Sequence, residues 1–194
     1  MIAQRKMDVT VVIAFLGFIA LGIPGGLLGL AWPSIRDLFG LTASAVGALL
    51  LADTLGFMVT SFSSGTLINR FGAGPALLAG STLRGVALIC ILFVPSWPTL
   101  ILAAFGMGLG SGVIDAGLNT YIAGYRSTRL LNWMHGCFGL GATIGPLILT
   151  ALFAAGLVWR WGYVMAGVAQ LSVALLLLLT LGHWRTTSSR QGGS

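Results

Sequence analysis

Six long apolar stretches, separated by short turn sequences, dominate this chain of 194 residues. A helix needs about 20 mainly apolar residues to cross a bilayer, because the hydrocarbon core is about 30 Å thick and each residue rises about 1.5 Å. All six stretches reach this length. The sequence therefore predicts an all-α membrane protein whose spans lie near residues 9–31, 43–66, 75–94, 97–121, 131–155 and 161–183.

The composition excludes an ordinary soluble domain. Apolar residues make up 57% of the chain and charged residues 7%, whereas soluble domains contain about 25% charged residues. The two cysteines, Cys90 and Cys137, lie inside apolar stretches and lack the spacing of metal ligands. Neither a disulfide framework nor a metal or cofactor is therefore predicted.

Turn residues and tryptophans mark four breaks between the spans. Pro, Gly and Ser start turns or interrupt helices, and Trp rings favour the headgroup zone of a membrane. The breaks are Trp32-Pro33-Ser34, Gly72-Ala73-Gly74-Pro75, Pro95-Ser96-Trp97-Pro98 and Trp159-Arg160-Trp161-Gly162.

The basic residues predict the orientation of the chain, because cytoplasmic loops carry an excess of Lys and Arg. Arg36 and Arg160 fall on one side of the predicted spans, and Arg84 falls within a span. The other side, predicted to be cytoplasmic, carries both termini together with Arg5, Lys6, Arg70, Arg126, Arg129, Arg185 and Arg190. These residues form no patch along the sequence, so a nucleic-acid partner is not expected.

The spans divide the chain into a cytoplasmic N-terminal segment (1–8), a transmembrane domain (9–183) and a flexible cytoplasmic tail (184–194). An alternative is that the first span is a signal peptide, since Ala20-Leu21-Gly22 resembles a cleavage site. Its apolar sequence continues through Leu30, which is too long for the hydrophobic region of a signal peptide. A retained span is therefore expected.

Two predicted loops on opposite sides of the membrane resemble each other. Such a repeat divides the protein into two three-helix units of opposite topology, as in many secondary transporters. Chance similarity between two short loops is the alternative. The loops are residues 65–72 and 155–162, and they share Leu67/Leu157, Arg70/Arg160 and Gly72/Gly162.

Three charged residues lie inside the predicted spans, namely Asp53, Arg84 and Asp115. Each costs about 2.5–3.5 kcal/mol at the centre of a membrane helix, so each is expected to face the bundle interior. Asp53 and Arg84 lie at matching depths and are expected to form an intramembrane ion pair, with either a structural or a functional role. One cation cannot neutralise two carboxylates, so Asp115 is the candidate for proton coupling.

Further polar residues accompany Asp115. Asn119 follows it by four residues, so both project from one face of a helix, with Ser111 one turn earlier. His135 could relay protons or hydrogen-bond near the interface, and Asn132 could line the same cavity. The glycines of residues 106–117 favour close helix packing, and Pro24 removes a backbone donor within the first span.

Two stretches resemble the major facilitator superfamily of transporters. Residues 65–72 are similar to the family's loop G-x-L-x-D-R-x-G-R-R, although Asn69 replaces its Asp and Ala73-Gly74 replace its basic pair. The fucose permease-like branch of the family is resembled by residues 108–119, followed by Leu131-Asn132-x-x-His135 and Phe138-Gly139-x-Gly141-Ala142.

The resemblance implies the N-terminal six-helix half of a twelve-helix fold in a bacterial plasma (inner) membrane. It implies proton coupling at Asp115, and Asn119 matches an asparagine of the branch. The tail 184–194 resembles the start of the linker between the two halves. The gating loop implied by the resemblance contains Gly65, Asn69, Arg70 and Gly72.

The leading functional hypothesis is symport of a small polar organic solute with protons by alternating access. The expected partners are the lipid bilayer, the solute, protons and a second six-helix half, which is either another gene product or a second copy. The alternative is a truncated or split half, or a six-helix scaffold, without transport activity of its own. An enzyme is not expected, because the chain contains neither His-Glu-x-x-His nor Gly-x-Ser-x-Gly.

Overall fold

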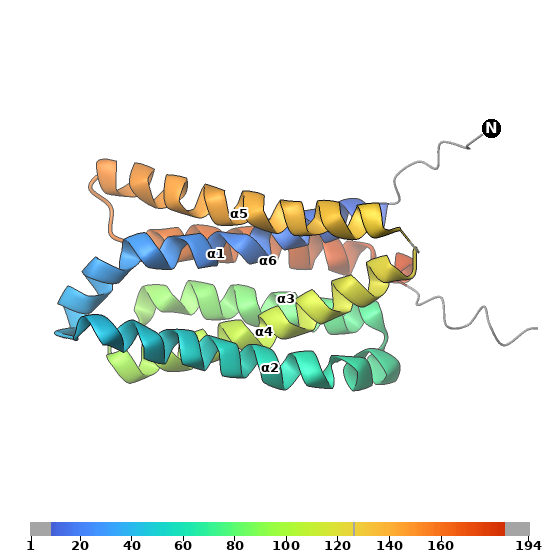
Figure 1. Ribbon diagram of the computed structural model, residues 1–194, viewed down its shortest axis with the longest axis horizontal. Helices are drawn as coiled ribbons and strands as arrows, with labels where there is room; N and C mark the ends of the chain where they lie inside the picture. Colours follow the sequence, from blue (N-terminus) through green and yellow to red (C-terminus); the bar gives the residue numbers. More distant parts are fainter. Residues whose placement is uncertain (1–8, 126, 185–194) are drawn as a thin grey trace, which may run out of the picture.

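The computed structural model describes residues 9–125 and 127–184, and within these residues the chain forms six long helices (Figure 1). Each is long and apolar enough to cross a membrane, which confirms the predicted fold class. Short 3-10 helices η1 (Ala43–Ala45), η2 (Ile91–Phe93) and η3 (Leu181–His183) flank them. The long helices are α1 (Val9–Phe39), α2 (Val46–Phe71), α3 (Ala73–Cys90), α4 (Trp97–Ala123), α5 (Thr128–Ala154) and α6 (Arg160–Leu179).

The first predicted break is wrong. Helix α1 continues through Trp32-Pro33-Ser34 and ends at Phe39, before Gly40, whose φ is 63°. Membrane helices tolerate Pro where neighbouring groups satisfy the freed carbonyl, whereas a positive φ suits Gly at a helix end. The other three predicted breaks fall at or beside helix ends.

The helices pack in one pattern that occurs twice. Helix α1 lies against α5, α4 lies against α2, and α3 lies against α6. Exchanging α1–α3 for α4–α6 maps these pairs onto one another, and Figure 1 shows that α1 and α4 run in opposite directions. This is the packing expected of a 3+3 inverted repeat.

Glycines permit the closest of these helix contacts. A Cβ atom at Gly108 or Gly112 of α4 would collide with the α2 main chain at Asp53 or Phe57. Gly22 of α1 faces the α5 main chain in the same way. The prediction that glycines of the fourth span allow close packing is confirmed.

Both described ends of the chain lie at one end of the bundle, as an even number of spans requires (Figure 1). There the Thr10 hydroxyl is hydrogen-bonded to the hydroxyls of Tyr125 and Tyr121, at 3.3 and 3.2 Å. The ring of Trp184 contacts Tyr121 with 4.7 Å between ring centroids. Trp184, predicted to begin the flexible tail, is therefore packed against the bundle.

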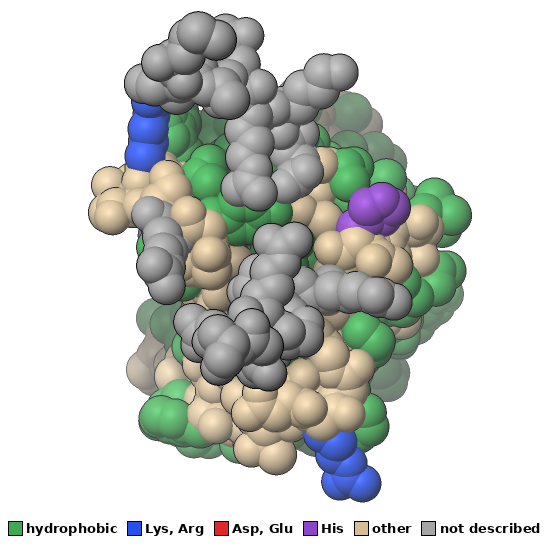
Figure 2. Space-filling view, turned by 90° about the vertical axis from the view of Figure 1, so that its right-hand side faces the viewer, with side chains coloured by type: hydrophobic (Ala, Val, Ile, Leu, Met, Phe, Trp, Pro, Cys, Tyr) green, Lys and Arg blue, Asp and Glu red, His purple; other side chains and the backbone are tan. Residues whose placement is uncertain are grey.

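Figure 2 views this end of the bundle and shows basic side chains and a histidine, with no acidic side chain of a described residue in view. Arg70 and Arg129 at this end are exposed. At the opposite end of the bundle, Arg36 in the last turn of α1 is paired with Asp37 at 2.7 Å. The cytoplasmic location of the end in Figure 2 stays a prediction. The other cations assigned to it, Arg5, Lys6, Arg126, Arg185 and Arg190, lie outside the described residues.

Candidate functional site

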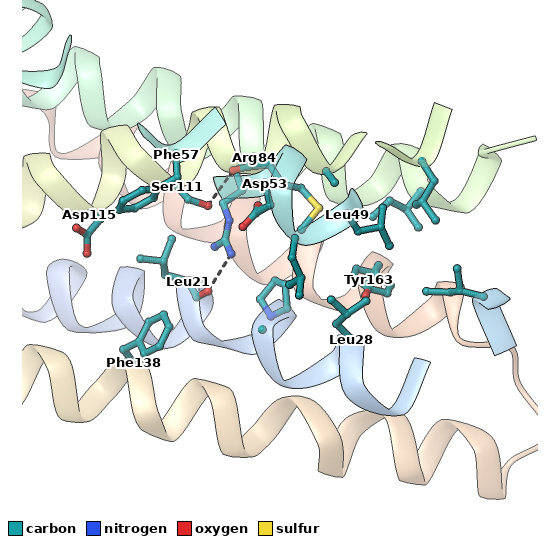
Figure 3. A pocket seen from close by; sticks show the side chains of 18 residues that line it. Leu21, Leu28, Leu49, Asp53, Phe57, Arg84, Ser111, Asp115, Phe138 and Tyr163 are labelled. Atoms are coloured by element: carbon teal, nitrogen blue, oxygen red, sulfur yellow. Dashed lines mark hydrogen bonds between the residues drawn. The ribbon is translucent and has the colours of Figure 1, made fainter. Parts of the chain in front are cut away.

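A cavity of about 400 Å³ lies between the helices, and each of the six contributes to its wall (Figure 3). Most of the lining side chains are apolar or aromatic, and few are polar. Charged residues also line the cavity, at a depth in the membrane where charge is unfavourable, so these charged residues are expected to function in this cavity. One lining residue from each helix in turn is Leu21, Asp53, Arg84, Asp115, Phe138 and Tyr163.

Two carboxylates line the cavity, and both are half-buried. Asp53 comes from α2 and Asp115 from α4. Within the described residues, the pair at salt-bridge distance is Arg36–Asp37, so neither cavity carboxylate has a cation in direct contact. Both acids are therefore available to a proton or to a bound molecule.

Arg84 of α3 joins three helices. Its Nη1 donates to the main-chain oxygen of Ala20 at 3.3 Å and to Oε1 of Gln170 at 3.1 Å. Its Nη2 donates to the main-chain oxygen of Leu21 at 2.8 Å. The guanidinium thereby links α3 to α1 and to α6, and the side chain is only 4% exposed.

One of the Arg84 hydrogen bonds replaces a backbone hydrogen bond that Pro24 cannot make. In an α-helix the carbonyl of Ala20 accepts from the N–H of residue 24, and Pro has no N–H. Arg84 donates to that carbonyl from the neighbouring helix and to the carbonyl that follows it. A buried side chain thus replaces the missing backbone donor, and α1 continues as one helix through this point.

The predicted ion pair between Asp53 and Arg84 is not a direct contact. The two groups lie within electrostatic range but beyond salt-bridge distance. Arg84 uses its Nη donors on carbonyl and amide oxygens instead, and its Nε has no hydrogen-bond partner among the described residues. Asp53 therefore interacts with the charge of Arg84 without contacting it.

The companions predicted for Asp115 are only partly assembled around it. Asn119 donates to the Asp115 main-chain oxygen at 2.9 Å, and His135 of α5 lies within electrostatic range of the carboxylate. The His135 ring is exposed and contacts Phe18 edge-on. Asn132 does not line this cavity, because it lies in a separate hollow beside Arg129 and Trp133.

The predicted gating loop lies at the end of α2, beyond the residues of this helix that line the cavity. Gly65, Asn69 and Arg70 are exposed in the last turns of α2, and Gly72 has a φ of 88° that separates α2 from α3. The Arg70 guanidinium lies over the Phe71 ring, 5.4 Å from its centroid. In the matching turn, Arg160 donates to the main-chain oxygens of Leu92 and Val94, both at 2.9 Å.

Sequence reasoning missed two polar residues of α6. Tyr163 lines the cavity, lies within electrostatic range of Asp53, and is 5% exposed. Gln170 is fully buried and accepts from Arg84. Gln170 interrupts an apolar run, a signal that could have identified it, but a Tyr near a span end resembles an interfacial aromatic.

Comparison with known proteins supplies the family. The chain matches the model of the Major Facilitator Superfamily over residues 13–193. It is 26% identical over 177 residues to the 4-hydroxybenzoate transporter PcaK of Pseudomonas putida, which covers 88% of this chain and 39% of that protein. It is 27% identical over 165 residues to the class C tetracycline resistance protein of Escherichia coli, covering 79% of this chain and 40% of that protein.

A third relative is the probable sulfoacetate transporter SauU of Cupriavidus necator, 25% identical over 154 residues, which cover 77% of this chain and 35% of that protein. The chain thus spans about two-fifths of the length of these curated relatives. The family consists of membrane transporters and not of enzymes. Because the family match covers nearly the whole chain and the fold has six apolar spans, the chain belongs to the major facilitator superfamily.

Proposed function

We propose that the chain forms one six-helix half of a transporter that moves a small polar organic solute by alternating access, coupled to protons at Asp115. The observation that carries this proposal is the half-buried carboxylate of Asp115 in a cavity, without a cation at salt-bridge distance among the described residues. Such a carboxylate can exchange a proton when the cavity opens to water. The solutes named for the relatives differ from one another, so they do not identify the solute of this chain.

Two outer helices support the need for a second half. In their most apolar segments, α2 and α5 bury fewer residues than the other four helices do. Each packs mainly against one neighbour, α4 or α1. We propose that these faces meet a second six-helix half, either a separate polypeptide or a second copy related by a twofold axis along the membrane normal.

The proposed location is a bacterial plasma (inner) membrane, with the end that carries Val9 and Trp184 on the cytoplasmic side. A labelling experiment tests the orientation in a background without Cys90 and Cys137. Thr42→Cys should react with a membrane-impermeant maleimide in intact cells, and Ser127→Cys should react only after permeabilisation. The reverse pattern would contradict the proposed orientation.

Affiliation with the fucose permease-like branch is part of the proposal, and residues 108–119 support it. That branch suggests symport of solute and proton. Symport requires the solute to leave Asp115 free for the proton, whereas exchange follows if both use the same carboxylate. The two modes move protons in opposite directions for a given direction of solute movement.

Proteoliposomes that enclose a pH-sensitive dye test the proposed function. Sugars, aromatic acids and organic amines are added outside in turn, and the pH inside is followed. At least one solute should change the internal pH in wild type and not in Asp115→Asn, while Asp37→Asn, an exposed surface variant, should behave as wild type. Solute uptake without proton movement, or proton movement that survives Asp115→Asn, would refute the coupling. Absence of any response would favour a half without transport activity of its own.

A further inference from the structure

We propose that the cavity binds an organic cation with an apolar body, and that the positive group of this cation lies at Asp115. This inference rests on the proposed transport function and names a substrate class for the same site.

The balance of charges in the cavity favours a cation. Two carboxylates, Asp53 and Asp115, and one guanidinium, Arg84, line it. Asp53 lies within electrostatic range of the permanently charged Arg84, whereas the neighbour of Asp115 within that range is His135, which carries no permanent charge. A bound cation would neutralise the Asp115 carboxylate, and a neutral solute would leave it uncompensated in an apolar cavity.

An anion would find one permanent cation, Arg84, in the described part of the cavity wall. Arg84 is the lining residue with a permanent positive charge, and its Nη atoms already donate to three oxygen atoms. Its Nε lacks a partner, but this atom is buried away from the cavity surface. An anionic solute would therefore meet two carboxylates and a single guanidinium that already donates to three oxygen atoms.

Aromatic rings lie at the Asp115 end of the cavity. Phe57 of α2 and Phe138 of α5 both line it, and Figure 3 shows their rings on the Asp115 side of Arg84. An ammonium group is attracted to aromatic faces as well as to a carboxylate. The remaining walls are mainly apolar and suit an apolar body attached to that group.

A second observation points to a ligand at the opposite end. Tyr163 is 95% buried, since its exposed fraction is 5%, and it lines the cavity. Its hydroxyl makes no hydrogen bond to any residue that the structure describes. The hydroxyl oxygen itself keeps accessible surface, so it can hydrogen-bond to a polar group on the far end of the solute.

A cation at Asp115 changes the expected mode of coupling. An ammonium group and a proton cannot both occupy the same carboxylate, so binding of the cation releases the proton of Asp115 to the aqueous phase. The cavity then exchanges a solute cation for a proton. Other titratable groups near this process are His135, within electrostatic range of Asp115, and Asp53, within electrostatic range of both Arg84 and Tyr163.

Three probes of similar size test the charge preference on the purified full chain in lipid nanodiscs. They are benzyltrimethylammonium, phenylacetate and benzyl alcohol, and calorimetric titration measures their binding. Only benzyltrimethylammonium should bind, and its affinity should fall as the pH is lowered, because protons compete for Asp115. Its own charge is permanent, so any proton released on binding comes from the protein.

Asp115→Asn should weaken binding of benzyltrimethylammonium by about tenfold or more, because the ammonium loses its partner in an apolar site. The matched control Asp37→Asn should bind as wild type does. Phe138→Ala removes a ring that is 41% exposed, so the fold should tolerate it. We expect this variant to weaken the cation by about three- to thirtyfold.

Preference for phenylacetate or benzyl alcohol, binding unaffected by Asp115→Asn, or no binding of any probe would overturn the cation assignment. These results separate the substrate class from the proposed function. If phenylacetate binds and changes the pH inside proteoliposomes, the cation assignment fails and transport stands. If benzyltrimethylammonium binds without moving protons across the membrane, the coupling fails and the site stands.

Discussion

The Arg84 contact with the Pro24 region can be tested by a double-mutant cycle. Arg84→Met leaves the Ala20 and Leu21 carbonyls and Gln170 without their donor. Hydrogen bonds inside membrane proteins contribute about 0.6 kcal/mol on average and up to about 1.7 kcal/mol. Loss of three such bonds should destabilise the bundle by about 2–5 kcal/mol.

Pro24→Ala supplies the backbone N–H that the Ala20 carbonyl lacks. In the Arg84→Met background this new donor restores one hydrogen bond, whereas in wild type Arg84 already occupies that carbonyl. The intrinsic gain from removing a helical Pro is present in both backgrounds and cancels in the cycle. The coupling energy between the two substitutions should therefore be about 0.6–1.7 kcal/mol.

Reversible unfolding in mixed micelles, followed by tryptophan fluorescence, measures the four free energies of unfolding. Pro33→Ala provides the matched control, because Pro33 lies in the same helix but outside the cavity. Its cycle with Arg84→Met should be additive within about 0.3–0.5 kcal/mol. An additive cycle for Pro24, or equal coupling for both prolines, would refute the idea that Arg84 replaces the missing donor.

Two further substitutions test the packing. Gly108→Ala should lower the free energy of unfolding by about 1–3 kcal/mol, because the new Cβ meets the α2 main chain. A Cβ atom at Gly139 would have no neighbour within 4 Å, so Gly139→Ala should change the free energy of unfolding by less than about 0.5 kcal/mol. Equal effects of the two substitutions in the same assay would contradict the helix contact. Arg160→Met should cost about 1–3 kcal/mol through the lost bonds to two carbonyls. Arg70→Met should cost less than about 0.5 kcal/mol, because Arg70 is exposed; equal thermal shifts for these two would be the contrary result.

Hydropathy and charge were sufficient to predict the six spans, because lipid imposes a minimum length on every crossing helix. They were insufficient at Pro33, where the sequence suggests a turn. A membrane helix can pass through Pro when packing and neighbouring donors compensate, and those partners are distant in sequence. Helix α1 ends before Gly40, which has a positive φ. A pattern of apolar residues does not reveal this backbone conformation.

The charged residues of the candidate site were predictable from the sequence, whereas the contacts that they make were not. Asp53, Arg84 and Asp115 line one cavity, as rare intramembrane charges should. Matching depth suggested a contact ion pair, but Arg84 bonds to the Ala20 carbonyl that Pro24 leaves free, to the Leu21 carbonyl and to Gln170. Spacing along α5 could not place Asn132, because one helix face can serve two separate hollows.

The central claim is that Asp115 exchanges protons with water through the cavity. Infrared difference spectroscopy on the full chain in lipid, recorded while the pH of the aqueous phase changes, tests it directly. One component of the carboxylic acid band should titrate with pH, remain in Asp37→Asn and in Asp53→Asn, and be lost in Asp115→Asn. A carboxyl signal that titrates identically in wild type and in Asp115→Asn, with no component lost, would contradict the claim.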